Sequence, residues 1–308
     1  MHIRTSCLIV LVRPARAFVQ AKGSSSLSTM AALGADSDEL RTVTWNIAAI
    51  NNNPLEYWTT YDAPAYTQLM VDVENMIDAP GDRDVPLGSI FPQAAVDELM
   101  ALMRGVGFEG VDEVAANWES DMKARTLVAG FLKDKALGSK RFMSMPDRFT
   151  NTVNTVDTEG AVGPIACRPS VINNYVGDLG SFGAWWSAWK VFMFESPLTV
   201  SNKRGVETKK AFEMLSKIPR AKYPALSEDE ERTSMPMQVL CLALFDAVLV
   251  HMMNTLSPSG EWLEIKRRLC DALFVKKQAR TLEILSSDRY SSCDVVFLQE
   301  VMNACSND

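Results

Sequence analysis

The stretch Asp294-Val295-Val296-Phe297-Leu298-Gln299-Glu300-Val301 is an apolar run that ends on a carboxylate, close to the end of this 308-residue chain. Such a run is typical of a short strand buried on both faces, and it would carry Glu300 to the end of a sheet. A second run, Arg41-Thr42-Val43-Thr44-Trp45-Asn46-Ile47, is rich in β-branched and aromatic residues and places Asn46 near its end. We expect the two runs to pair side by side, in parallel, in a small sheet with helices packed over it.

The long segment between these strands has the periodicity of helices. Apolar residues recur at helical spacing through much of residues 55–289, and Gly and Pro residues separate the repeats. A short ribbon is predicted at residues 170–175, and an exposed linker within residues 202–231. The fold class that follows is α+β, predominantly helical, with a small sheet from the two terminal strands and a large all-α insertion.

The most apolar segment, residues 235–256, approaches the length of a membrane span. However, Gln238, Asp246 and His251 fall within it, and each would be costly in lipid. The segment is therefore predicted to be a central core helix, and no membrane span is expected.

The first 35 residues have the composition of a targeting leader. They contain Arg4, Arg13, Arg16 and Lys22 but no acidic residue, which is typical of an organellar transit peptide. This interpretation predicts a mitochondrial or plastid location. The alternative is that Met30 is the true start, in which case the protein would be cytoplasmic.

Overall composition narrows the class of protein. A hydrophobic content of 47% with 22% charged residues is ordinary for a folded globular protein. The net charge of -7 gives no strong signal for nucleic-acid binding. The six cysteines form no C-x-x-C pair, so neither a zinc site nor a disulfide framework is indicated.

The motifs Thr44-Trp45-Asn46-Ile47 and Val295-Val296-Phe297-Leu298-Gln299-Glu300-Val301 together resemble the first two core strands of the endonuclease/exonuclease/phosphatase family. These are magnesium-dependent phosphoesterases similar to deoxyribonuclease I. The resemblance implies that Asn46 lies beside the scissile phosphate and that Glu300 binds Mg²⁺ or Mn²⁺. It covers only the N-terminal part of that family, because only 8 residues (308 minus 300) follow Glu300.

The resemblance divides the chain into three predicted parts. These are a targeting leader or disordered segment at residues 1–35, a partial family-like core at residues 36–54 and 290–308, and a helical insertion at residues 55–289. The family usually joins its first two strands by a few tens of residues, so the insertion is a departure from its pattern.

Few other residues suggest chemistry. Of the two histidines, His2 lies in the leader, and His251 on its apolar helix is interpreted as a core residue. The cations of residues 133–168 could hold a phosphate, although a solvated surface is the preferred interpretation. They are Lys133, Lys135, Lys140, Arg141, Arg148 and Arg168.

Two hypotheses about function follow. In the first, the chain is the N-terminal part of a magnesium-dependent phosphoesterase that acts on a phosphate ester of unknown class and is inactive in isolation. In the second, it is a non-enzymatic helical module whose insertion binds a protein partner through aromatic surfaces.

Overall fold

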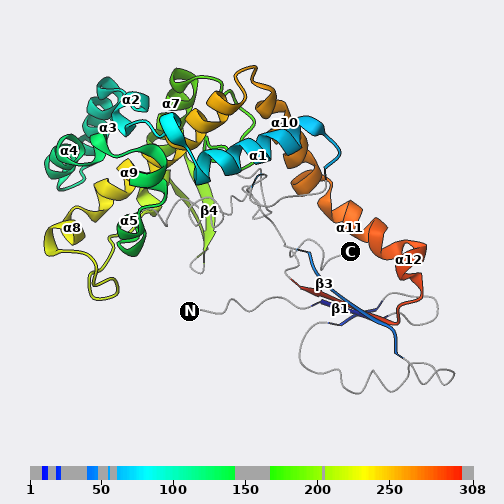
Figure 1. The fold of residues 1–308 in the computed structure, drawn as a ribbon. Coiled ribbons are helices and arrows are strands. Elements are labelled where there is room, and N and C mark those ends of the chain that lie inside the picture. The colour runs from blue at the N-terminus through cyan, green and yellow to red at the C-terminus, as the bar shows by residue number, and fades with distance from the viewer. Residues whose placement is uncertain are drawn as a thin grey trace. The chain divides into compact units, whose positions relative to one another are not determined.

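The computed structural model describes residues 9–12, 19–21, 40–47, 55, 61–142, 167–202 and 205–299. It divides the chain into two compact units (Figure 1). Unit 1 comprises Met1–Asn51 and Cys270–Asp308, and unit 2 comprises Asn52–Leu269. The predicted predominance of helix with a small sheet is confirmed.

Unit 1 is built on a four-stranded sheet with the strand order β2-β1-β6-β3. Its strands are β1 (Ile9–Val12), β2 (Val19–Ala21), β3 (Thr42–Asn46) and β6 (Val295–Gln299). Strands β3 and β6 pair in parallel, from Thr42 opposite Val295 to Asn46 opposite Gln299. The predicted parallel pairing is therefore confirmed.

Hydrogen bonds at the two ends of the β3–β6 pair show which residues of β3 turn their backbone groups toward β6. The carbonyl of Arg41 accepts from Val295 N–H at 3.3 Å, and Ile47 N–H donates to the Gln299 carbonyl at 3.1 Å. Because a parallel ladder engages alternate residues, Val43 and Trp45 also turn their backbone groups toward β6. The intervening residues of β3 turn theirs toward the outer edge of the sheet.

Strands β1 and β2 fall inside the predicted leader. β1 runs antiparallel to β6, with Leu11 opposite Val296, and β2 pairs with β1. An apolar strand such as Ile-Val-Leu-Val fits beside the apolar β6, which has a row of backbone groups on each side to satisfy. Residues 9–12 and 19–21 are thus part of the sheet, while the targeting role stays a prediction.

One face of the sheet packs against helix. Ile47, Val296 and Leu298 form a buried cluster with Leu285 of α11, and Val43 and Trp45 pack against it. The helical part of unit 1 comprises η7 (Asp271–Val275), α11 (Lys277–Ser286) and α12 (Asp288–Ser291).

Unit 2 is mainly helical. Its first half contains α1 (Pro64–Asp78), η2 (Gly81–Arg83), α2 (Leu87–Ile90), α3 (Gln93–Gly105), α4 (Val111–Ser120), η3 (Met122–Ala124), η4 (Leu127–Leu132) and α5 (Lys135–Ser139). Its second half contains α7 (Phe182–Lys190), η5 (Val191–Glu195), β4 (Leu198–Asn202), β5 (Gly205–Lys209), η6 (Ala211–Met214), α8 (Glu228–Arg232), α9 (Ser234–Leu256) and α10 (Glu261–Cys270).

Helix α9 is the central element of unit 2 (Figure 1). It is long and apolar enough to cross a membrane by length and composition, but 67% of its most apolar window is buried inside the protein. Of the three polar residues that argued against a lipid environment, Asp246 and Gln238 are fully buried and His251 is half-buried. The predicted core helix is confirmed.

A buried ion pair explains how α9 accommodates a carboxylate. Arg168 Nε lies 2.8 Å from Asp246 Oδ2, and neither side chain is exposed. Trp189 of α7 donates its indole N–H to the same oxygen at 3.1 Å. The pair therefore joins three segments of unit 2 through one carboxylate, in an interior where an unpaired charge would be costly.

The segment that carries Arg168 is held by side chains that bond to its backbone. Lys266 donates to the Ser170 carbonyl at 2.6 Å, and Trp185 donates to the Pro169 carbonyl at 2.9 Å. The predicted ribbon at residues 170–175 is wrong, because these residues form turns. The Ser170 carbonyl accepts from the buried Lys266, and no described strand pairs with these residues.

The tryptophans of α7 are core residues. Trp185, Trp186 and Trp189 are buried, and Trp186 stacks on Trp189 with ring centroids 5.5 Å apart. The Phe91 ring meets Trp185 and Trp186 edge-on. These aromatic side chains are used for packing, so they do not form the aromatic partner-binding surface that the second hypothesis requires.

The insertion is not entirely helical. Strands β4 (Leu198–Asn202) and β5 (Gly205–Lys209) pair antiparallel, with Leu198 opposite Lys209. The predicted linker overlaps this pair of strands. Alternation of Thr and Val with polar residues is the strand signal that was present there.

The two ends of unit 2 meet each other. The side chains of Tyr61 and Arg268 are hydrogen-bonded, although 207 positions (268 minus 61) separate them. A folded unit whose ends meet can be inserted between two neighbouring elements of a chain without separating them. This property accounts for a sheet formed from strands at opposite ends of the sequence.

We expect removal of residues 1–21 to reduce the protection of backbone amides only on the side of β6 that faces β1. The register turns the amides of Val296 and Leu298 toward β1, whereas those of Val295, Phe297 and Gln299 bond to β3. In the truncated protein the first two amides should exchange roughly tenfold faster or more, measured residue by residue by NMR. The other three amides are the internal control. Unchanged protection of Val296 and Leu298 would show that β1 does not cover β6.

Replacing Arg168 by Met should destabilise the protein in a pH-dependent way. Burial raises the pKa of Asp246 from 3.8 to about 6, with Arg168 pulling it down. The folded carboxyl holds its proton more tightly than the unfolded one, so this group favours the fold below about pH 4, and the contribution is lost as the pH rises through 6. Without the guanidinium this pKa should rise further. The decrease in the free energy of unfolding, measured by denaturant titration, should be about 3–5 kcal/mol near pH 8 and should become smaller toward pH 5.

The double variant Arg168→Met/Asp246→Asn is the control for this experiment. Asparagine removes the buried charge and keeps an oxygen for the Trp189 N–H, so the pH dependence between 5 and 8 should disappear. If Arg168→Met lowered the free energy of unfolding by the same amount at every pH, or by more toward pH 5, the result would contradict this account of the ion pair.

Candidate functional site

The predicted site residues lie at the end of the parallel pair. Asn46 is exposed at the end of β3, opposite Gln299 of β6. Glu300 follows β6 directly but lies outside the described residues. Gln299 donates its side-chain amide to the Thr44 hydroxyl at 3.2 Å. The structure thus brings Asn46 beside the residue that precedes Glu300, and the roles assigned to both stay untested.

The expected magnesium site likewise stays a prediction. Within the described ranges, no group of three or more His, Cys, Asp and Glu side chains is placed to hold a metal ion.

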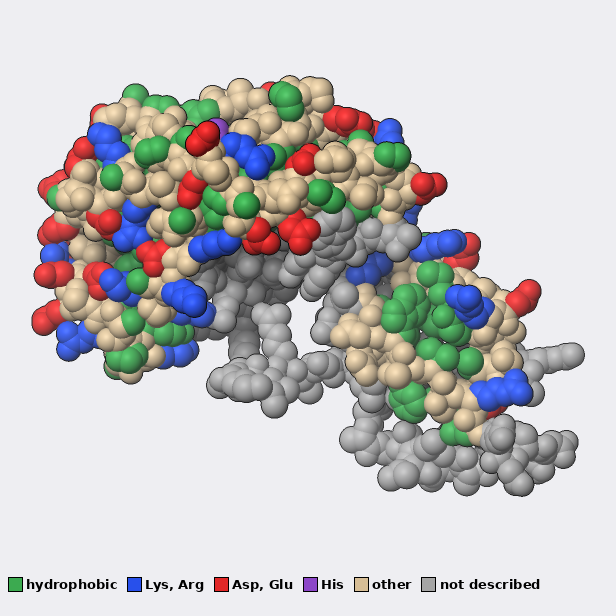
Figure 2. All heavy atoms as spheres, in the orientation of Figure 1, with side chains coloured by type: hydrophobic (Ala, Val, Ile, Leu, Met, Phe, Trp, Pro, Cys, Tyr) green, Lys and Arg blue, Asp and Glu red, His purple; other side chains and the backbone are tan. Residues whose placement is uncertain are grey.

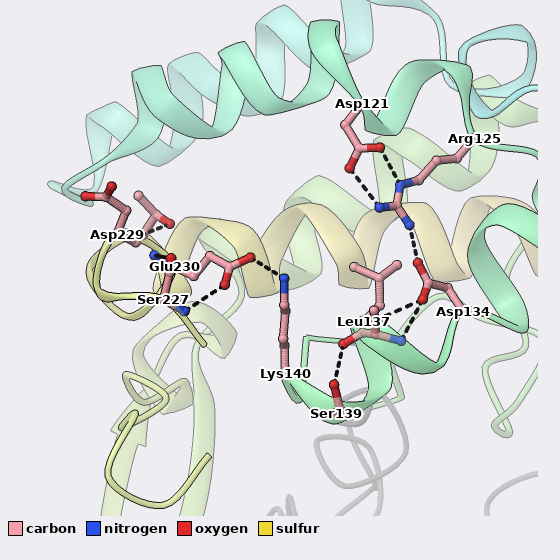
Figure 3. A network of polar contacts seen from close by, with 11 residues as sticks. Asp121, Arg125, Asp134, Leu137, Ser139, Lys140, Ser227, Asp229 and Glu230 are labelled. Atoms are coloured by element: carbon pink, nitrogen blue, oxygen red, sulfur yellow. Dashed lines mark hydrogen bonds and ion pairs between the residues drawn. The ribbon is translucent and has the colours of Figure 1, made fainter. Parts of the chain in front are cut away.

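Three of the cations considered for phosphate binding have carboxylate partners. Lys140 pairs with Glu230 at the start of α8 (Figure 3). Arg168 is buried against Asp246, and Lys133 lies 3.5 Å from Asp78. Arg148 lies outside the described residues. The Lys140 and Lys133 contacts join helices on the surface, whereas Arg168 is buried and so is not part of the solvated surface that was the preferred interpretation.

Arg125 is the centre of the neighbouring part of this network (Figure 3). Its Nε and Nη2 donate to the two oxygens of Asp121 at 2.9 and 2.8 Å, and its Nη1 donates to Asp134, the N-cap of α5. Partial burial raises the pKa of Asp134, but hydrogen bonds from Arg125 and from Ala136 N–H hold it below its usual value. The network fixes the entry of α5.

A groove in unit 1 is the best candidate for a functional site. It has a volume of about 840 Å³ and runs between β3 and the α11–α12 helices. Its lining residues are Val43, Thr44, Trp45, Arg280, Glu283, Ile284, Ser287, Arg289 and Tyr290. Sequence reasoning missed it because the groove requires α11 to pack beside β3, which no local pattern predicts.

The groove combines half-buried apolar side chains with charged ones at the rim. Val43 and Trp45 supply the strand side, and Ile284 and Tyr290 supply the helix side. On the face of unit 1 that Figure 2 shows, hydrophobic side chains gather between Lys and Arg side chains. Such a surface can bury apolar groups and orient a charged one.

The charges lining the groove are not balanced. Arg280 pairs with Glu283, with Nη1 and Oε1 2.6 Å apart, and both side chains are exposed. Among the described residues Arg289 makes no ion pair. The groove is therefore locally cationic in a chain whose net charge is -7.

The strand side of the groove is also an edge of the sheet. Among the described strands, β3 pairs with β6 alone. Since Val43 and Trp45 turn their backbone groups toward β6, Thr42 and Thr44 turn their N–H and C=O groups outward. Such an edge is a template for an added strand.

Comparison with known proteins places the chain in a family. The family model described as "Domain of unknown function (DUF8234)" matches residues 84–267, which is 184 of the 308 residues (267 minus 84 plus 1). All of the matched residues belong to unit 2. No curated protein and no solved structure matches the chain.

This finding corrects the resemblance to the endonuclease/exonuclease/phosphatase family, for which there is no match. The two short motifs that carried the resemblance lie outside residues 84–267. A buried parallel strand followed by a polar residue is a general consequence of sheet packing, so two such motifs do not specify a family. The matched region covers more than half of the chain, and the chain belongs to the DUF8234 family.

Proposed function

We propose that this protein is a protein-interaction module that binds an extended, acidic segment of a partner protein in the groove between β3 and α11. The observation that carries the proposal is the coincidence of an outward-facing strand edge, an apolar floor and an unpaired cation in one groove. The earlier hypothesis placed the partner on aromatic surfaces of the helical insertion, and the burial of those aromatic residues moves the proposal to unit 1.

The backbone of the partner would supply most of the affinity. An added strand can exchange hydrogen bonds with the outward N–H and C=O groups of Thr42 and Thr44, which replaces contacts with water. Alternate side chains of the added strand point to one face of the sheet, where Trp45 and Ile284 line the groove. Small apolar residues at every second position fit this arrangement.

Charge would select the partner. An acidic side chain near Arg289 gains a charge-assisted hydrogen bond, whereas a basic one is repelled. Because the Arg280–Glu283 pair is already satisfied, Arg289 is the residue whose charge should matter most.

A labelled synthetic hexapeptide of alternating glutamate and valine provides the test, with binding to the full-length protein followed by fluorescence anisotropy. We expect saturable binding, and Arg289→Glu should weaken it roughly tenfold, about 1.4 kcal/mol. Arg83→Glu, which changes an exposed arginine of unit 2, is the matched control and should leave binding unchanged.

Two further peptides separate strand addition from charge attraction. The same hexapeptide with N-methylated backbone amides keeps its charge and loses its donors, so it should bind much more weakly. A lysine–valine hexapeptide should not bind. Equal binding of the N-methylated peptide, or absence of binding by the parent peptide, would overturn the proposal.

A further inference from the structure

A small cleft in unit 2 lies between the first turn of α7 and the second half of α9. Its volume is about 270 Å³. It is lined by Ile90, Gly180, Ser181, Phe182, Trp185, Ala247, Val250, His251, Asn254 and Thr255. The α9 residues recur at intervals of three and four, so they share one face of that helix.

The walls of the cleft are apolar and aromatic. Phe182 and Trp185 come from α7, with ring centroids 5.4 Å apart, and Ala247 and Val250 come from α9. Trp185 is fully buried and donates its indole N–H to Pro169. Its ring is fixed by that bond, so the wall is preformed and a ligand need not order it.

Most polar groups of the cleft already have structural partners. Asn254 donates to the Leu179 carbonyl at 2.9 Å and accepts from the indole N–H of Trp262 at 2.9 Å. Ser181 caps α7 by accepting from Ala184 N–H. Each of these two side chains therefore already bonds to the fold and helps to shape the cleft.

His251 is the polar group that a ligand could use. It is half-buried, and its described polar contact is with the Thr255 hydroxyl, 3.5 Å from Nε2, which is at the limit of a hydrogen bond. Burial lowers the pKa of His251, so the ring is neutral at pH 7. A neutral imidazole offers one donor and one acceptor.

No Asp, Glu, Lys or Arg is among the described residues that line the cleft. A charged ligand would lose water there without gaining a partner of opposite charge. We propose that the cleft binds a small, uncharged aromatic molecule of the phenol class, with its ring against Phe182, which packs on the buried Trp185, and its hydroxyl on His251. The volume limits the ligand to about the size of a single substituted ring.

Phenol itself is the probe for this site. Because the chain has two histidines, His2 and His251, the ring signals of His251 can be assigned by their loss in His251→Leu. In the wild-type protein phenol should shift these signals saturably, with a dissociation constant on the order of 1 mM for a ligand of this size. Benzoate, which is charged, and cyclohexanol, which lacks the aromatic ring, should each bind at least roughly tenfold more weakly.

Two variants test the location of the phenol site by ligand-observed NMR. Ala247→Leu should fill the cleft and abolish binding, and His251→Leu should weaken binding roughly tenfold. The matched control is Ala101→Leu, on the exposed surface of α3. Cooperative unfolding of each variant confirms that it is folded. If Ala247→Leu does not fold, His251→Leu still decides the test.

Several outcomes would overturn the proposal. They are a linear shift of the His251 signals with phenol concentration, undiminished binding by both cleft variants, and benzoate binding as tight as that of phenol. Arg289→Glu, which acts in unit 1, should leave phenol binding unchanged, so this test and that of the groove are independent.

Discussion

The parallel pairing of β3 with β6 is the interaction on which the organisation of this chain depends. It joins residues about 250 positions apart, and closing a flexible loop of that length would cost about 5 kcal/mol. The hydrogen bond between Tyr61 and Arg268 shows how unit 2 avoids this cost, because its own fold brings its ends together. The DUF8234 match, at residues 84–267, falls within unit 2.

Unit 2 in turn depends on the ion pair between Arg168 and Asp246. Helix α9 is so apolar that a charge inside it needs a fixed partner, and Arg168 comes from a turn held by Lys266 and Trp185. Burying a charge pair is seldom the most stable solution, but it admits one arrangement of the segments that supply the charges. We infer that the pair helps to specify how the turn, α7 and α9 pack.

The sequence predicts the elements of this fold better than their assembly. Val43 and Val296 lie in apolar runs whose length and composition suffice to predict strands and their pairing. Asp246 within an apolar run similarly predicts a core helix over a membrane span. The resemblance to a phosphoesterase failed because it rested on motifs that sheet packing produces in many folds. The groove in unit 1 could not be predicted from the sequence for a related reason. Trp45 and Ile284 meet only when α11 packs beside β3, and neither residue is unusual in its own segment.

The amide hydrogen of Thr44 tests the central claim, that β3 presents an open edge which accepts a partner strand. Its exchange rate can be measured by NMR in the free protein and with saturating glutamate–valine hexapeptide. The account predicts that the Thr44 amide exchanges much faster than that of Trp45, which faces β6, and that the peptide slows it to a comparable rate. A Thr44 amide that is already as protected as Trp45 in the free protein, or that the peptide leaves unchanged, would contradict it.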